Sequence, residues 1–126
     1  MLKYIELKTG YADNGPAWIV RVTPSKSGRT IYFNGRALKA AGGRAVAGNY
    51  IDAETLEEYW VSGVKKDKCD RLRAAAGIVW IEQSAVALYL EQTGAAYLDS
   101  RRLQLIPDLE PTDPGAFVAV ENRKSV

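Results

Sequence analysis

The stretch AWIVRVTPSKSGRTIYFNGRAL, residues 17–38, indicates the fold class of this chain. Hydrophobic and polar residues alternate on both sides of the turn-forming segment 24–28, as in two antiparallel strands joined by a hairpin. Asn34-Gly35 follows the second strand, and this dipeptide is a strong signal for a two-residue hairpin turn. A short third strand through Ala37 and Leu38 is therefore expected.

Further strands are expected on both sides of this stretch. In residues 4–8, Ile5 and Leu7 alternate with more polar residues, which predicts a half-buried strand. Residues 56–64 and the apolar run 77–82 have the length and composition of two more strands. The glycine-rich segment 40–48 is expected to form a mobile loop, because glycine and small residues favour irregular structure.

One helix is expected after the last of these strands. Ser84 can cap a helix over residues 85–92, and Gly94 lies where a C-terminal glycine cap belongs. Hydrophobic residues recur along this segment with helical spacing, so one face of the helix is expected to pack against the sheet.

Two parts of the chain differ in composition. Residues 1–94 are expected to form a β-rich core domain with its packed helix. Residues 95–126 hold three of the five prolines and two short apolar runs, which predicts a C-terminal extension with one extra hairpin and a frayed end.

Together these elements predict a mainly β (α+β) fold, either a small, strongly bent antiparallel sheet or an SH3-like barrel. A chain of 126 residues has room for one hydrophobic core. The expected core residues are Ile5, Leu7, Trp18, Val20, Val22, Ile31, Phe33, Val61, Ile78, Trp80, Val86 and Leu90.

The composition excludes several classes of enzyme and metal site. The chain has no histidine and one cysteine, Cys69. It therefore cannot build a Ser-His-Asp or Cys-His catalytic site, or a zinc or haem site ligated by histidine. Cys69 lies in a charged segment without a base partner, so a reactive thiol is not expected. We expect no catalytic residue, no cofactor and no metal ligand, and a protein that is not an enzyme.

The expected compartment is the cytoplasm. No apolar stretch approaches the ~20 residues that a membrane helix needs, and the first eight residues mix apolar with charged side chains, unlike a signal peptide. A single free thiol fits a reducing compartment. No contact with a membrane is expected.

Three phrases of the sequence resemble a group of small bacterial proteins of unknown function: YIELKTGYADNGPAWI at 4–19, SKSGRTIYFNG at 25–35 and EEYWVSGVKKDKCDR at 57–71. Some members of that group are labelled 1-deoxy-D-xylulose-5-phosphate synthase. This chain is several-fold too short for the large α/β domains of that enzyme and has no Gly-Asp-Gly stretch leading to a metal-binding Asn. After Asp70-Arg71 it has Leu72-Arg73, where the group has a His-Trp pair. The resemblance therefore implies membership but no mechanism.

Two candidate surfaces point to binding. In the first, an exposed aromatic residue beside a basic loop contacts a protein partner; its residues are Tyr59, Trp60, Lys65, Lys66 and Arg71. In the second, a basic barrel face binds RNA or single-stranded DNA; its residues are Arg21, Lys26, Arg29, Tyr32 and Arg36. A net charge of only +2 does not favour nucleic acid. The preferred hypothesis is a protein-interaction module, with nucleic acid as the alternative and a homo-oligomer left open.

Two further segments are not expected to bind ligands. Residues 25–30 resemble a phosphate-binding loop in composition only, because the Gly-x4-Gly-Lys-Ser/Thr spacing and the following helix are missing. Asp108, Glu110 and Asp113 are separated by prolines and are interpreted as a solvated acidic stretch rather than a cation site.

Overall fold

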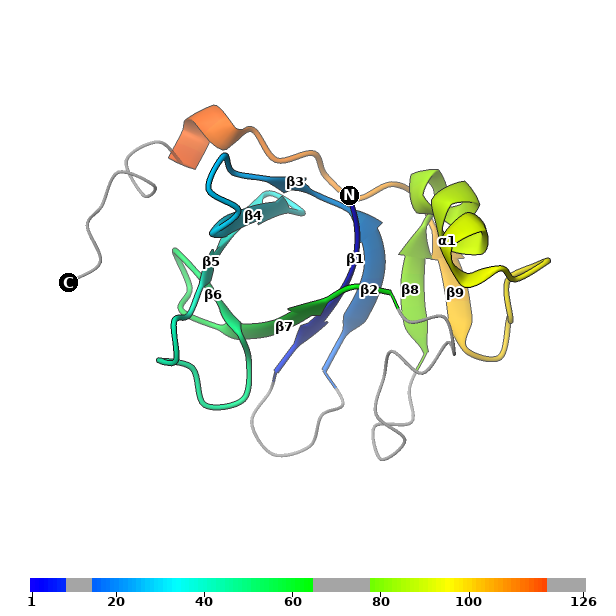
Figure 1. The fold of residues 1–126 in the computed structure, drawn as a ribbon, viewed down its shortest axis with the longest axis horizontal. Helices are drawn as coiled ribbons and strands as arrows, with labels where there is room; N and C mark the ends of the chain where they lie inside the picture. The colour runs from blue at the N-terminus through cyan, green and yellow to red at the C-terminus, as the bar shows by residue number, and fades with distance from the viewer. Residues whose placement is uncertain (9–14, 65–77, 118–126) are drawn as a thin grey trace.

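The computed structural model describes residues 1–8, 15–64 and 78–117, and in these ranges it confirms a β-rich fold with one short α-helix. The strands form a single sheet that curls into a half-barrel (Figure 1). They are β1 (Leu2–Leu7), β2 (Ala17–Arg21), β3 (Thr23–Pro24), β4 (Thr30–Phe33), β5 (Arg36–Ala40), β6 (Tyr50–Asp52), β7 (Glu58–Ser62), β8 (Val79–Glu82) and β9 (Leu103–Ile106). The helical segments are η1 (Gln83–Ala85), α1 (Val86–Thr93) and η2 (Pro114–Phe117).

The strand order explains the curl. From one edge to the other it is β3-β4-β5-β6-β7-β1-β2-β8-β9. The pairs are antiparallel except that β8 runs parallel to both β2 and β9. Only Val22 separates β2 from β3, so one continuous stretch of chain lies in the middle of the sheet and then forms its edge. The strands from β3 round to β2 therefore enclose a common core (Figure 1).

The inner face of the curl carries most of the expected core. Six of the expected residues are buried there: Ile5, Val20, Val22, Ile31, Phe33 and Val61. Leu7 and Trp18 pack against them from partly buried positions. The period-2 pattern was a good guide here because every one of these strands turns the same set of alternate residues inward.

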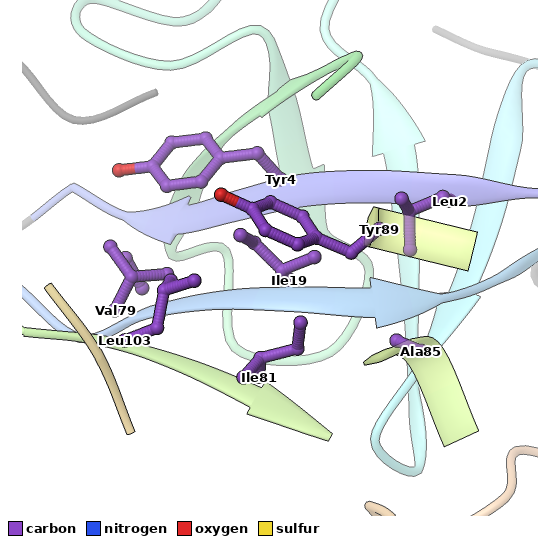
Figure 2. Close-up of a cluster of buried hydrophobic side chains, with 9 residues drawn as sticks. Leu2, Tyr4, Ile19, Val79, Ile81, Ala85, Tyr89 and Leu103 are labelled. Carbon is purple, nitrogen blue, oxygen red and sulfur yellow. The ribbon is translucent and has the colours of Figure 1, made fainter. Parts of the chain in front are cut away.

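A second core on the outer face was not predicted. Tyr4 and Ile19 are buried with Tyr89 of α1, as Figure 2 shows. Ile5 belongs to the inner cluster, so Tyr4, its neighbour in β1, faces the opposite side of the sheet. The expectation that β1 is half-buried was therefore wrong, since α1 covers the face expected to meet solvent. α1 also brings partly buried Val86 and Leu90 to this cluster.

In β8 the expectation of which alternate residues are buried was wrong. Val79 and Ile81 are buried in the outer cluster, whereas Ile78 is exposed and Trp80 is half-buried. The apolar run 77–82 offers no alternation by which to choose a face. The choice is made by α1, which packs on the face of β8 that carries Val79 and Ile81.

The predicted hairpin turn at Asn34-Gly35 and the glycine cap at Gly94 are confirmed, whereas the predicted cap at Ser84 is wrong. Asn34 and Gly35 have φ of 49° and 73°, as the two central residues of a type I′ hairpin turn require. Gly94 ends α1 with φ of 72°. Ser84 is not the helix cap, because it lies inside η1, where its N–H donates to Asp108 Oδ1 at 2.7 Å.

The C-terminal extension adds to the sheet in a way that differs from the expected hairpin. β9 pairs in parallel with β8. Of the second apolar run, only Phe117 lies within the described residues, where it ends η2. Leu103 is buried in the outer cluster, Leu109 packs on the inner one, and Phe117 packs against Tyr32. Within the described part of the chain, no helix is long and apolar enough to span a membrane.

Candidate functional site

The aromatic pair of β7 is divided between the two faces of the sheet. Tyr59 points inward and is 3% exposed, whereas Trp60 points outward and is 41% exposed. Tyr59 packs edge-on against Phe33, and burial raises its pKa. Of the two aromatic residues proposed for the interaction surface, Trp60 is the exposed one and Tyr59 belongs to the core, because neighbouring strand residues face opposite sides.

Trp60 has a polar neighbour on the adjacent strand. It lies opposite Glu6 of β1 in the antiparallel register. The buried Glu6 carboxylate accepts hydrogen bonds from the Tyr4 hydroxyl and from Lys8 Nζ, the latter at 3.2 Å. Trp60 is therefore bordered on β1 by a carboxylate that is buried and already hydrogen-bonded.

The loop beside Trp60 is fixed by Glu58, two residues earlier on the same face. Glu58 Oε1 accepts hydrogen bonds from the backbone N–H groups of Val46, Ala47 and Gly48 at 3.0, 2.8 and 2.9 Å. These donors, with Gly48 the strongest, lower the pKa of Glu58. The carboxylate thus ties the backbone of residues 46–48 to β7.

Two further contacts attach this loop to β7. The Asn49 side chain makes two 2.7 Å hydrogen bonds, in which Nδ2 donates to the Val61 carbonyl and Oδ1 accepts from the Val61 N–H. Gly48 approaches the strand so closely that a Cβ there would lie 2.5 Å from the Tyr59 carbonyl oxygen. The last three residues of the segment 40–48, which was expected to form a mobile loop, are therefore anchored along β7.

The turn into β7 presents a second apolar side chain. Leu56 has φ of 65° and is 72% exposed. A left-handed backbone conformation is uncommon for a bulky residue, and persists where the surrounding structure over-determines it. Here the turn is fixed by Asp52, whose carbonyl accepts from the Leu56 N–H at 2.9 Å.

Asp52 is the organising residue of that turn. Its side chain is buried; Oδ1 accepts from the N–H groups of Glu54 and Thr55, and Oδ2 accepts from Arg36 Nη1 at 2.8 Å. Burial acts to raise the pKa of Asp52, but the hydrogen bonds and the guanidinium outweigh it, so the pKa is lowered. The carboxylate is ionised at neutral pH, and its ion pair also raises the pKa of Arg36.

We use the name Trp60 face for Trp60 and Val46, which flank the anchored Glu58, together with Leu56 in the turn that enters β7. All three apolar residues are exposed. From the sequence only Trp60 could be proposed, because nothing in the sequence shows that Leu56 turns outward or that Glu58 holds Val46 in place. Lys65, Lys66 and Arg71, expected beside Trp60, lie outside the described residues.

The residues expected to bind nucleic acid do not form one exposed surface. Arg21, Lys26 and Arg29 are exposed, the last two in the turn between β3 and β4. Tyr32 is 5% exposed, with its ring 6.2 Å from that of Phe117, and Arg36 is paired with Asp52. The expected stacking role of Tyr32 was wrong because Phe117 of η2 covers its ring, a long-range contact for which the residues around Tyr32 carry no signal.

The described residues hold no group of three or more His, Cys, Asp or Glu side chains that can bind a metal ion. Within the acidic stretch, Asp108 accepts from the Ser84 N–H, and Asp113 accepts from the Gly115 N–H at 2.9 Å. Residues 25–30 form a hairpin turn in which the Ser25 N–H donates to the Thr30 carbonyl at 2.8 Å, rather than a loop leading to a helix.

Comparisons of the chain with family models, with curated proteins and with solved structures found no match. The resemblance to small bacterial proteins of unknown function stays a prediction.

Proposed function

We propose that this protein is a non-enzymatic interaction module of the cytoplasm, which binds a partner protein through the Trp60 face. The observation that carries the proposal is the outward position of Trp60, 41% exposed beside an anchored loop. Tryptophan is among the residues that contribute most to protein–protein binding. The single cysteine supports a reducing compartment.

The strained position of Leu56, in the turn that enters β7, also supports a binding role. Single exposed hydrophobic residues are common on soluble proteins and need no explanation. A leucine held in a left-handed conformation is different, because glycine or asparagine would occupy that position with less strain. A gain in binding from the exposed side chain accounts for a leucine at this position.

The charges near Leu56 suggest what the partner carries. Glu54 and Glu57 are exposed on either side of it in the chain. Carboxylates at the rim of an apolar patch favour partners with lysine or arginine at matching positions, since charge complementarity selects partners and speeds association. We therefore propose a partner surface with an apolar centre and a basic rim.

Affinity capture with matched variants tests this proposal. Trp60→Ser removes the indole, whereas Lys26→Ser changes an exposed residue of the β3–β4 turn and serves as the control. We expect a stoichiometric partner that binds the wild type and Lys26→Ser, is lost with Trp60→Ser, and survives nuclease treatment.

Two results would contradict the proposal. One is a partner captured equally by Trp60→Ser and the wild type. The other is nucleic acid that co-purifies at low salt and is lost at high salt, because phosphate binding weakens steeply as salt rises.

A further inference from the structure

A short irregular segment of the C-terminal extension crosses the half-barrel between β9 and η2. We call this segment, residues 107–112, the strap. It forms no strand or helix and contains Pro107 and Pro111. In Figure 1 it passes over the N-terminal end of β1 and along β3, far in sequence from both.

Three hydrogen bonds hold the strap on the half-barrel, and each is donated by a backbone N–H group. The N–H of Ser84 donates to Asp108 Oδ1 at 2.7 Å, and the N–H of Gly35 donates to Thr112 Oγ1 at 2.6 Å. In the third hydrogen bond the donor is on the strap: the N–H of Leu109 donates to Glu82 Oε1 at 3.1 Å. The strap is thus held by two hydrogen bonds near its start and one at its end.

Glu82 and the inner core cluster make the central contacts with the strap. Glu82 is 6% exposed, and its other oxygen accepts from the Arg21 N–H at 2.7 Å, so the carboxylate has a fixed orientation. The Leu109 side chain packs on the inner core cluster beside this carboxylate. A leucine in a pocket, with its own N–H bonded to a fixed acceptor, is how extended peptides are commonly recognised.

The strap does not close-pack on the half-barrel. A groove of about 400 Å³ remains, lined on one side by the strap and on the other by residues that include Val20, Tyr32 and Phe33. The strap is held by a few specific contacts beside this open groove, and its removal uncovers the part of the inner core cluster on which Leu109 packs.

We propose that this groove is a docking site for an extended segment of a partner protein, and that the strap occupies it in cis as a competing ligand. The strap itself indicates the chemistry of the partner segment: an aspartate, a leucine directly after it, and a threonine or serine three residues beyond the leucine. This inference does not depend on the Trp60 face, which lies on β7 and its neighbouring loops.

A cis segment is a strong competitor even when its own contacts are weak. A segment on a short linker has an effective concentration in the millimolar range. A partner segment of similar affinity therefore binds the intact protein poorly, and binds well once the strap contacts are broken.

A peptide binding assay on the full-length chain tests the proposal. The probe is a labelled peptide of residues 106–117, IPDLEPTDPGAF. The strap variant combines Leu109→Ser with Thr112→Ala, and the matched control is Glu91→Ala on the exposed side of α1. We expect the strap variant to bind the peptide at least about tenfold more tightly than the wild type and Glu91→Ala do, because cis competition is removed.

Peptide controls and oligomeric state decide between the outcomes. A peptide with serine in place of the leucine should bind the strap variant at least about tenfold more weakly, because it lacks the side chain that packs on the inner core cluster. Equal binding of both peptides, or no binding at about 1 mM, the effective concentration of the tethered strap, overturns the proposal. A dimer in which two copies exchange straps overturns the assignment to a different partner.

Amide hydrogen exchange on the wild-type protein gives a second test that needs no substitution. If the strap opens locally, the Ser84 and Gly35 amides exchange much faster than the amide of Ile5, a fully buried residue of β1 inside the sheet. Equal protection at all three positions means that the strap opens only when the whole protein unfolds, and this result overturns the proposal.

Discussion

At the residue scale, Asp52 links the buried interior to the surface turn that carries Leu56. One carboxylate oxygen binds the guanidinium of Arg36 and the other orders the turn. A buried carboxylate with this many partners is ionised at neutral pH, and the loss of a single partner leaves polar groups without hydrogen bonds. The chemistry of one side chain therefore fixes the shape of the turn.

Asp52→Asn is expected to destabilise the protein by about 1–3 kcal/mol at pH 7, because its amide N–H group faces Arg36 where an acceptor is needed. The pKa of Asp52 is lowered in the folded state, so its contribution is present above the unfolded-state pKa of about 3.9 and is lost as pH falls through the lower folded-state pKa. Denaturant unfolding at several pH values measures this. A difference between the two proteins that stays constant from pH 7 to pH 2 would contradict the assignment.

Leu56→Gly is expected to stabilise the protein by about 1 kcal/mol, since glycine adopts a left-handed conformation without steric strain. The same variant is expected to bind the partner more weakly, because it lacks the exposed side chain. Thermal unfolding and partner capture, measured on the same preparation, test both effects. A variant that is more stable and binds as well as the wild type would show that Leu56 is not part of the binding face.

At the element scale, much of the sheet could be predicted from the sequence, and the strands and loops that were predicted wrongly have physical causes. The strands at 17–21, 30–33 and 58–62 follow from alternation and turn residues. β6 was missed, since residues 49–55 are rich in turn formers and only three of them form the strand. The loop before β6 was expected to be mobile because its anchors, Glu58 and Asn49, act across the chain and leave no local signal.

Glu58→Gln is expected to loosen the loop at 46–48, because a neutral amide accepts hydrogen bonds less strongly than a carboxylate. Amide hydrogen exchange of Val46, Ala47 and Gly48 should be faster in this variant. In the wild type, the anchor is expected to hold above the ordinary carboxyl pKa and to be lost as pH falls through the lowered pKa of Glu58. Unchanged exchange at all three amides would mean that the carboxylate does not hold the loop.

Two substitutions in neighbouring positions test which face of β8 is buried. Ile81→Ala is expected to cost about 2–5 kcal/mol, because the side chain is fully buried in the outer cluster. Ile78→Ala, at an exposed position just before the strand, is expected to change stability by less than about 0.5 kcal/mol. Denaturant unfolding of both variants should show this contrast. A larger loss for Ile78→Ala would contradict the arrangement of β8.

At the scale of the whole molecule, the sheet is covered unevenly on its outer face. α1 covers residues of β1, β2, β8 and β9, and Phe117 packs on Tyr32 of β4 and Ala37 of β5. The outer face of β7 leaves Trp60 exposed. Which face each covering segment takes is set by long-range packing, and for this reason the sequence predicted the mainly β class and the inner core but not the second core or the strap.

Site-specific photo-crosslinking tests the central claim most directly. A photoreactive phenylalanine analogue is placed at position 60 in the full-length protein and, as a control, at the exposed position 26. If the Trp60 face binds a partner protein, position 60 should give one dominant protein crosslink that position 26 does not give. A crosslink at position 26 alone, or none at either position, would contradict a protein-binding role for the Trp60 face.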